Sequence, residues 1–181
     1  MNKVQTDNDK RYIGLKIKLR LDNLPDKQSI NVFDCFSGNG TLWDSVKKRT
    51  NKDISVLRID SKNDRAGLYL KGDNLKFMNT DLSLFDIIDL DSYGIPYKQL
   101  KIVLSKGYRG IIHVTAIQSM MGNLPRRLLY DLGYPPEMVY KIPSLFNRDG
   151  YDKIKQWLAS QGIKTILGWS NGRKNYFVLR T

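Results

Sequence analysis

The stretch Ser29-Ile30-Asn31-Val32-Phe33-Asp34-Cys35-Phe36, followed by Ser37-Gly38-Asn39-Gly40 and then by residues 41–49, decides the fold of this chain. The apolar and β-branched residues of 29–36 predict a buried strand. The two glycines predict a tight turn, and residues 41–49 predict a helix with basic residues at the end that favours cations. A strand, a glycine turn and a helix in this order are typical of an α/β layer fold.

The same alternation continues outward from this unit. Strands joined through helices run parallel with right-handed crossovers, whereas an Asn171-Gly172 turn predicts an antiparallel hairpin at the end of the chain. We therefore expect an α/β protein with a mostly parallel sheet, a C-terminal antiparallel hairpin and helices on both faces. The further strands are predicted at 54–59, 75–79, 85–90, 110–117, 164–169 and 175–180, and the further helices at 96–107, 125–132 and 151–161.

Composition excludes several classes of protein. With 41% hydrophobic residues in 181, the chain is not of the disordered type. A single cysteine, Cys35, excludes a disulfide scaffold. The apolar runs are far shorter than the ~20 residues of a spanning helix, and residues 1–7 lack the apolar core of a signal peptide. The expectation is a cytoplasmic protein without a membrane segment.

Charge points to a class of partner. Lys plus Arg number 30 against 18 Asp plus Glu, a net charge of +12. A strongly basic domain attracts polyanions, so nucleic acid is the favoured partner, with a merely solubilising surface as the alternative. The polar and basic residues 1–29 are expected to form an N-terminal extension, in which 17–24 make a short packed helix or strand. Residues 30–181 are expected to form one domain.

Acidic or small residues follow several predicted strands. Asp34 and the glycines Gly38 and Gly40 follow the first strand, Asp60 ends the second, and Asp81 ends the third. The carboxyl ends of parallel strands meet at the edge where such sheets bind ligands. Glycines let a ligand approach the backbone. Asp60 can accept both hydroxyls of a ribose, and Asp81 can accept the amine of an adenine. The set predicts a pocket for an adenosine-bearing cofactor.

The run from Asp34 to Gly40 resembles the first motif of class I S-adenosylmethionine-dependent methyltransferases. The resemblance extends over roughly residues 30–181, since the strand order and the closing hairpin also match. It implies a Rossmann-like class I methyltransferase fold with about seven strands, the last of them antiparallel. It also implies S-adenosylmethionine over the two glycines, its ribose at Asp60 and its adenine near Asp81. The cofactor-binding residues expected on this basis are Asp34, Phe36, Gly38, Asn39, Gly40, Asp60 and Asp81.

Two alternatives for the glycine turn stay open. The first is an ordinary tight connection between a strand and a helix. The second is a nicotinamide or flavin cofactor, whose fingerprint requires a third glycine where the helix packs on the strand. Trp43 stands at that position and argues against the second alternative.

The run from Phe85 to Pro96 carries the candidate catalytic residues. It is similar to a motif of tRNA (guanine-N2) dimethyltransferases, which read Asp-Pro-Phe/Tyr-Gly-Ser-Pro. The resemblance implies that Asp91 orients an amine and that Tyr93 stacks on a base held out of its helix. Ser92 replaces the family's proline, and those enzymes continue into an RNA-gripping domain, so N-methylation is better supported than tRNA as the substrate. The alternative for Asp91 is a cap on the following helix.

Other chemistries are excluded by residue types. Cytosine C5-methylation needs a cysteine nucleophile after a proline in this loop, whereas Cys35 lies inside a predicted strand. One histidine and one cysteine do not make a zinc site, and no metal is expected. His113 is expected to be a packed strand residue. Neither a Gly-x-Ser-x-Gly elbow nor a Walker loop is present.

The basic side chains Arg126, Arg127, Lys10 and Arg11 are the candidate phosphate contacts, with a solvated helix face as the alternative for the arginine pair. The function expected is N-methylation of an exocyclic amine of a base, with S-adenosylmethionine as cofactor. The expected substrate is a base in a tRNA-like RNA or in DNA, and RNA is favoured. The alternatives are a nucleic-acid-binding protein of this fold without turnover and a small-molecule or protein methyltransferase. A partner subunit or a homodimer is expected to help in substrate recognition.

Overall fold

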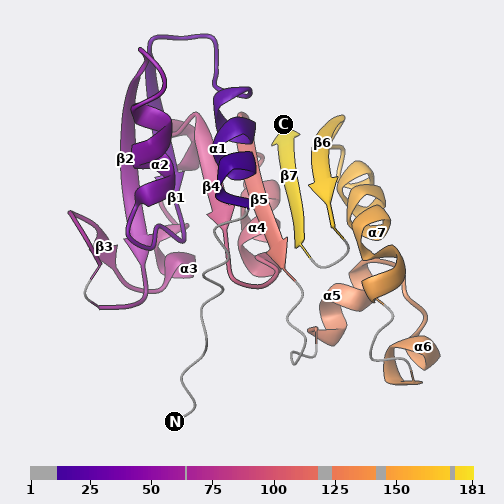
Figure 1. The fold of residues 1–181 in the computed structure, drawn as a ribbon. Coiled ribbons are helices and arrows are strands. Elements are labelled where there is room, and N and C mark those ends of the chain that lie inside the picture. The colour runs from indigo at the N-terminus through magenta and orange to yellow at the C-terminus, as the bar shows by residue number, and fades with distance from the viewer. Residues whose placement is uncertain (1–11, 64, 118–123, 142–145, 172–173) are drawn as a thin grey trace.

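A seven-stranded sheet in the order β3-β2-β1-β4-β5-β7-β6 forms the centre of the computed structural model (Figure 1). The structure describes residues 12–63, 65–117, 124–141, 146–171 and 174–181. The strands are β1 (Ser29–Asp34), β2 (Asp53–Asp60), β3 (Leu70–Lys71), β4 (Ile87–Asp91), β5 (Ile111–Ile117), β6 (Thr165–Ser170) and β7 (Lys174–Arg180).

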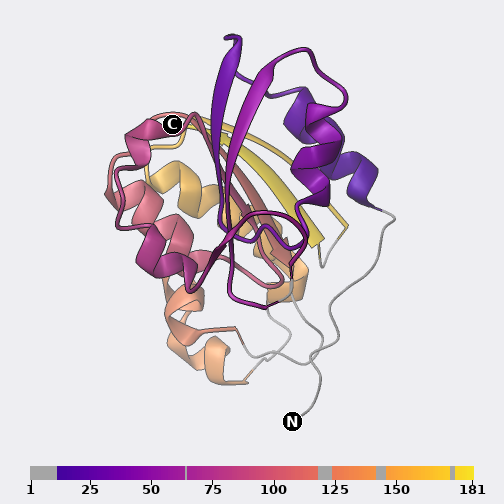
Figure 2. The same ribbon diagram turned by 90° about the vertical axis from the view of Figure 1, so that its left-hand side faces the viewer.

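Helices cover both faces of the sheet. Helices α1 and α2 lie on one face, and α3, α4 and α7 lie on the other (Figure 2). Among the described residues, no helix has the length and apolar run needed to cross a membrane. The helices are α1 (Ile13–Leu21), α2 (Thr41–Lys47), α3 (Asn74–Phe77), the 3-10 turn η2 (Leu82–Leu84), α4 (Tyr97–Ser105), α5 (Arg126–Asp131), α6 (Pro136–Lys141) and α7 (Phe146–Ser160).

The pairing confirms the expected fold class. Strand β1 pairs in parallel with β2 and β4, and β4 pairs in parallel with β5. Strand β7 runs antiparallel between β5 and β6, so the hairpin predicted from Asn-Gly is present. The strand order reverses at β1, which lies between β2 and β4. The carboxyl ends of β1, β2, β4 and β5 therefore share one edge, called here the carboxyl edge, and this is where such sheets bind ligands.

The third strand is not where the sequence pattern places it. Residues 74–77, expected in a strand, form α3, because the Asp73 side chain accepts the Leu75 amide and starts a helical turn. The strand is Leu70–Lys71, which pairs with the end of β2. Asp81 consequently lies before β4, at the amino edge of the sheet, where it caps η2. The predicted place of Asp81 at the carboxyl edge is therefore wrong.

The first helix belongs to the folded unit. Ile17 and Arg20 of α1 are only 4% and 3% exposed, and α1 packs against α2 and the sheet. Residues 1–29 were expected to be an extension of the domain. The part of this segment that forms α1 instead contributes to the hydrophobic core. Helix α6 was not expected from the sequence, and α7 begins at Phe146 rather than at 151.

The face of the sheet under α1 and α2 changes character along the strands. Near the amino edge it carries apolar side chains such as Val32, Ile87 and Ile111. Near the carboxyl edge the same face carries buried Asp89 and His113. Because side chains alternate along a strand, these residues share a face and a direction. A polar layer is thus built at the carboxyl edge.

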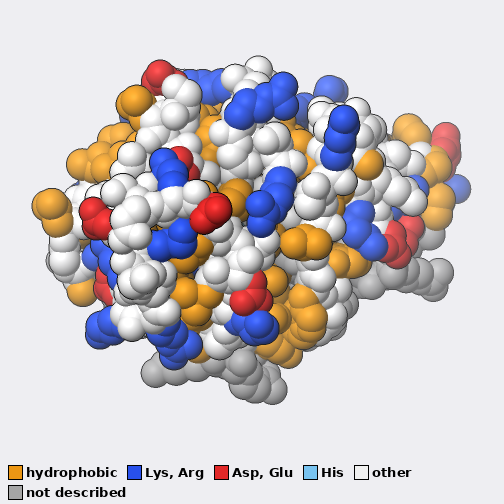
Figure 3. All heavy atoms as spheres, turned by 90° about the horizontal axis from the view of Figure 1, so that it is seen from above, with side chains coloured by type: hydrophobic (Ala, Val, Ile, Leu, Met, Phe, Trp, Pro, Cys, Tyr) orange, Lys and Arg blue, Asp and Glu red, His pale blue; other side chains and the backbone are white. Residues whose placement is uncertain are grey.

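Basic side chains are not confined to that edge. Seen from above, the amino edge of the sheet shows Lys and Arg spread among apolar and acidic side chains (Figure 3). Exposed positive charge is therefore present at the amino edge, away from the carboxyl edge.

Candidate functional site

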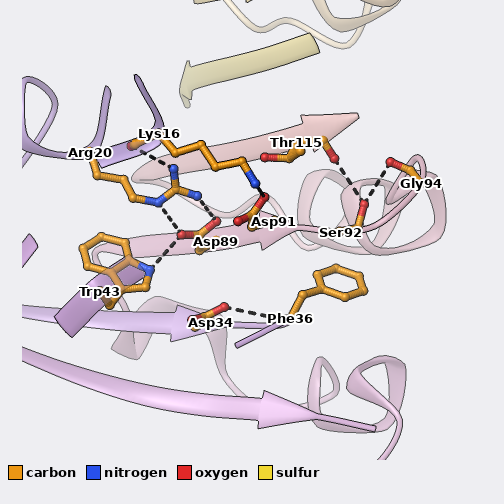
Figure 4. A network of polar contacts seen from close by, with 10 residues as sticks. All are labelled: Lys16, Arg20, Asp34, Phe36, Trp43, Asp89, Asp91, Ser92, Gly94 and Thr115. Atoms are coloured by element: carbon orange, nitrogen blue, oxygen red, sulfur yellow. Dashed lines mark hydrogen bonds and ion pairs between the residues drawn. The ribbon is translucent and has the colours of Figure 1, made fainter. Parts of the chain in front are cut away.

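A buried ion pair fixes α1 to the middle of the sheet. Arg20 donates from Nε and Nη2 to the two carboxylate oxygens of Asp89, each at 2.7 Å, and both side chains are almost fully buried. The indole of Trp43 on α2 donates to the same carboxylate at 2.7 Å (Figure 4). A buried carboxylate requires such partners, because an unpaired one is strongly destabilising. Asp89 therefore holds both helices in place.

Asp91 lies two residues further along β4, at the carboxyl edge. Its Oδ1 accepts a hydrogen bond from Lys16 Nζ at 2.6 Å, and its side chain is 17% exposed. Burial alone would raise the pKa of Asp91, but the cations of Lys16 and Arg20 outweigh burial, so its pKa lies below the usual value. Asp91 is thus an ionised carboxylate at the rim of the polar layer.

The loop after Asp91 is held by backbone contacts. The Ser92 hydroxyl lies 3.1 Å from the carbonyl oxygens of Gly94 and Thr115, and the Ile117 amide donates to Gly94 at 2.7 Å. Ser92 is buried, whereas Tyr93 is 52% exposed. The loop is therefore fixed with the tyrosine ring facing solvent.

The helix-capping alternative for Asp91 does not hold. The residue that caps α4 is Pro96, and no side chain makes a capping hydrogen bond there. The carboxylate of Asp91 points instead toward Lys16 (Figure 4).

The glycine turn and Asp60 meet at the ends of β1 and β2. Gly38 has a φ of +51° and Gly40 a φ of +75°, conformations that favour glycine. Asp60 accepts the Gly38 amide at 2.9 Å and the Lys62 amide at 2.8 Å, and Arg65 Nε lies 3.2 Å from it. A carboxylate has about four acceptor positions, so Asp60 keeps capacity for a further donor.

The space over the turn is open on one side and filled on the other. A Cβ added at Gly38 would meet nothing within 4 Å, whereas one added at Gly40 would lie 0.9 Å from the guanidinium of Arg58. Ser37 Oγ and Arg58 Nη2 are buried there without a hydrogen-bond partner among the described residues. Arg58 Nη2 lies 3.8 Å from Asp44 Oδ2, so Ser37 Oγ is the buried polar atom that would fit a polar ligand at this turn.

Asp34 completes the polar layer beside Asp89 (Figure 4). It is 4% exposed and accepts the Phe36 amide at 3.3 Å. Burial, followed by the negative charges of Asp89 and Asp91, raises the pKa of Asp34 well above its usual value. A cationic ligand group next to this carboxyl would be stabilised by it.

The structure brings most of the predicted cofactor residues together. Asp34, Phe36, Gly38, Asn39, Gly40 and Asp60 all lie on β1, its turn or the end of β2. Asn39 is exposed and accepts the Ala66 amide at 3.5 Å. Asp81 is the exception, because it lies at the opposite edge.

Asp73 lies at the carboxyl edge and was not among the residues predicted from the sequence. It follows β3 at the carboxyl edge, the place assigned to Asp81, and the next residue, Asn74, donates to the Cys35 carbonyl at 2.9 Å. The signal was the run Gly72-Asp73-Asn74, a glycine followed by two residues that favour turns and helix caps.

Lys16 was missed as well. Lys16 and Arg20 are four residues apart and so share one face of a helix, and that face meets Asp89 and Asp91. The spacing of Lys16 and Arg20 can be read from the sequence. That this helix face contacts β4 cannot.

The predicted nucleic-acid contacts divide into two groups. Arg126 and Arg127 lie exposed on α5, and Arg127 Nε is 3.3 Å from Asp131. Lys10 and Arg11 lie outside the described residues.

Solved structures share this fold. A protein from Escherichia coli assigned as a methyltransferase matches with a TM-score of 0.56 and 11% identity, over 99% of this chain and 89% of that one. A Clostridium thermocellum protein assigned as an rRNA methylase matches with a TM-score of 0.55 and 14% identity, over 93% and 94%. A S-adenosylmethionine-dependent methyltransferase from Archaeoglobus fulgidus matches with a TM-score of 0.52 and 12% identity, over 92% and 93%.

These likenesses concern the fold. The chain spans about half the length of two larger matched methyltransferases. No protein-family model and no curated protein sequence matches the chain. At these low identities, the comparisons show that the chain has the Rossmann-like fold of these methyltransferases.

Proposed function

We propose that this protein is a S-adenosylmethionine-dependent methyltransferase that methylates an exocyclic amine of a nucleobase. The observation that carries the proposal is that two features follow the carboxyl ends of neighbouring, paired strands. The open side of the Gly38 turn faces this edge from β1, and the Asp91-to-Gly94 loop faces it from β4. The structural neighbours, which include methyltransferases, support the same reading.

The residues of the first feature fit the donor. S-adenosylmethionine supplies a methyl group activated by a positively charged sulfur. Asp60 has the acceptor capacity for ribose hydroxyls, and the cluster of Asp34 with the negative charges of Asp89 and Asp91 would favour a neighbouring ammonium group. Asp73 takes the place of Asp81 as the candidate acceptor for the adenine amine, because it lies at the carboxyl edge. Arg58 must shift if the donor also covers Gly40.

The residues of the second feature fit the acceptor. A nucleobase amine needs an oxygen that accepts its N–H and an aromatic face that holds the ring. Asp91 is ionised and partly exposed, and the Tyr93 ring is 52% exposed. Positioning and electrostatics would supply the catalysis, without a covalent intermediate.

A substrate in RNA, with tRNA as one case, is the narrower part of the proposal. It is supported by the net charge of +12, by the similarity of residues 85–96 to tRNA dimethyltransferases, and by the neighbour assigned as an rRNA methylase. DNA carries the same phosphates and exocyclic amines as RNA, so DNA is the alternative substrate. A partner subunit or a second copy of the chain would extend the surface for recognition.

The test is transfer of a labelled methyl group from S-adenosylmethionine to bulk RNA or DNA. We expect Asp91→Ala to lower the rate by about 100-fold, as for other groups that stabilise developing charge. We expect Tyr93→Ala to lower it by about tenfold through loss of base stacking. The control is Asp81→Asn at the opposite edge, which should keep the wild-type rate. A wild-type protein that folds but transfers no methyl group to either polymer would overturn the proposal.

A second candidate is a nucleic-acid-binding protein of this fold without turnover. Two contacts favour it: Lys16 already neutralises Asp91, and Arg58 fills the space over Gly40. This candidate predicts nucleic-acid binding by wild type and Asp91→Ala alike, with no methyl transfer by either.

A further inference from the structure

The connection between β5 and α7 carries a surface that the proposed reaction does not use. It holds two short helices, α5 and α6, at the end of the molecule toward which β4 and β5 point (Figure 1). The turned view also places α5 and α6 at this end, below α4 (Figure 2). A long connection with its own helices at the ligand edge is commonly functional.

Helix α5 is firmly attached to the body of the protein. Leu128 and Leu132 are 2% and 4% exposed and belong to the core. Asp131 accepts hydrogen bonds from Tyr97 and from Lys101 of α4, the latter at 3.1 Å. The outer face of α5 is therefore held in a fixed position.

The outer face combines a guanidinium with aromatic rings. Arg126 Cζ lies 4.4 Å from the ring centre of Tyr140 on α6, and Arg126 Nη1 donates to the Tyr140 hydroxyl at 3.2 Å. Tyr140 is 60% exposed and Tyr130 36% exposed, and a side-chain interaction with Tyr140 raises the pKa of Tyr130. Met138 is also exposed, at 38%. Exposed large side chains that gather in one place, unlike those scattered singly, mark interaction sites.

This chemistry is suited to one kind of partner. Unpaired bases stack on exposed aromatic rings and on arginine planes, and phosphates bind guanidinium groups. The bases of a duplex are stacked on each other and do not offer their faces. Arg127 and Lys141, the sequence neighbours of Arg126 and Tyr140, are exposed as well, with Arg127 Nε 3.3 Å from Asp131. A single strand matches both the rings and the charge, whereas an acidic protein surface would match the charge alone.

We propose that Arg126, Tyr130 and Tyr140 form a stacking platform for an unpaired nucleotide of single-stranded nucleic acid. This inference rests on the proposed function for the identity of the polymer, and it places the strand that flanks the target base on α5 and α6. Arg126, already set behind one face of the Tyr140 ring, orders that ring so that a base can approach it.

The test is the affinity for a fluorescein-labelled single-stranded RNA of mixed sequence, measured by anisotropy without S-adenosylmethionine. The same measurement is made with DNA of that sequence and with the duplex. We expect Tyr140→Ala to weaken binding of the single strands by about five- to hundredfold, with an unchanged salt dependence. Tyr140→Phe, which keeps the ring, should bind like wild type.

Arg126→Ala should weaken binding and also lower the slope of log affinity against log salt by about one. Its matched control is Arg109→Ala, because Arg109 is an exposed arginine before β5 at the amino edge. Arg109→Ala should leave the affinity unchanged. Thermal unfolding of each variant separates a structural role from a binding role. If the α5–α6 contact is only structural, the variants lose stability and their affinity for the single strand is unchanged.

Equal single-strand affinities for Tyr140→Ala and wild type would overturn the inference, as would a preference of the wild type for the duplex. A wild type that transfers no methyl group but binds single strands in a Tyr140-dependent way would contradict the proposed function. The inference about the platform would remain. If Tyr140→Ala changed neither methyl transfer nor affinity, the platform would be contradicted and the proposed function would remain.

Discussion

At the scale of residues, two ion pairs join α1 to β4 because the spacings match. Lys16 and Arg20 are four residues apart, which is about 6 Å along a helix. Asp91 and Asp89 are two residues apart, which is about 6.6 Å along a strand. Two residues on one helix face therefore meet two residues on one strand face, at 2.6 and 2.7 Å.

The buried pair should be sensitive to the loss of one partner. We expect Arg20→Met to lower the free energy of unfolding by about 3–5 kcal/mol, because it leaves Asp89 charged and buried. Adding Asp89→Leu should restore most of this loss, with about 1 kcal/mol remaining for the indole of Trp43, which loses its acceptor. Urea unfolding of the single and double variants measures both values. A double variant no more stable than Arg20→Met alone would contradict the account.

The pair at the rim should give a pH-dependent effect. The folded pKa of Asp91 lies below its unfolded value of about 3.9, so its contribution to stability is present above that pH and is lost as pH falls through the folded pKa. We expect Lys16→Met to cost roughly 1–3 kcal/mol at neutral pH. The difference from wild type should shrink below about pH 4 in urea titrations. A difference that stays constant with pH would show that Lys16 acts by packing alone.

His113 should weaken the fold in mild acid. Burial, followed by the positive charges of Arg20 and Arg180, lowers its pKa well below the usual value, so the unfolded chain binds a proton that the folded chain does not. Stability should therefore fall as pH drops below about 6.5, by up to about 1.4 kcal/mol per pH unit from this group. We expect the difference between wild type and His113→Gln to change with pH in that window. Parallel pH profiles of the two proteins would refute the assignment.

At the scale of elements, the two glycines of the β1–α2 turn differ in their surroundings. Gly38→Ala should cost about 1–2 kcal/mol, since only the left-handed backbone opposes it. Gly40→Ala should cost more, because its methyl group must also displace the guanidinium of Arg58. Thermal unfolding of the two variants ranks them, and an equal loss for both would mean that Arg58 is not packed there.

Elements with a strong local signal were predictable from the sequence. The run 29–40 gave a strand and a glycine turn, and Asn171-Gly172 gave the closing hairpin, because local chemistry determines both. The third strand was not predictable, since it has only two residues and Asp73 starts a helix directly after it. Because the third strand was predicted at 75–79, Asp81 was predicted at the carboxyl edge, which is the wrong edge. The placement of α1 depended on contacts with β4, which no local pattern contains.

At the scale of the whole molecule, the strand order follows from the connections. Parallel strands with right-handed crossovers leave few arrangements, and the order 3-2-1-4-5-7-6 places β1 and β4 side by side. The glycine turn and the Asp91 loop therefore follow neighbouring strands, although Gly40 and Asp91 are 51 positions apart in the sequence. The sequence indicated which residues to bring together at this edge, but not the cations from α1 that neutralise them.

The most direct test of this account is a calorimetric titration of the protein with S-adenosylmethionine. We expect heat of binding at a single site in the wild type and in Asp81→Asn, and clearly weaker binding in Asp60→Ala, because Asp60 is assigned to the ribose. Binding that Asp60→Ala leaves unchanged, or a folded wild-type protein that shows no heat of binding, would contradict the claim that the carboxyl edge holds the methyl donor.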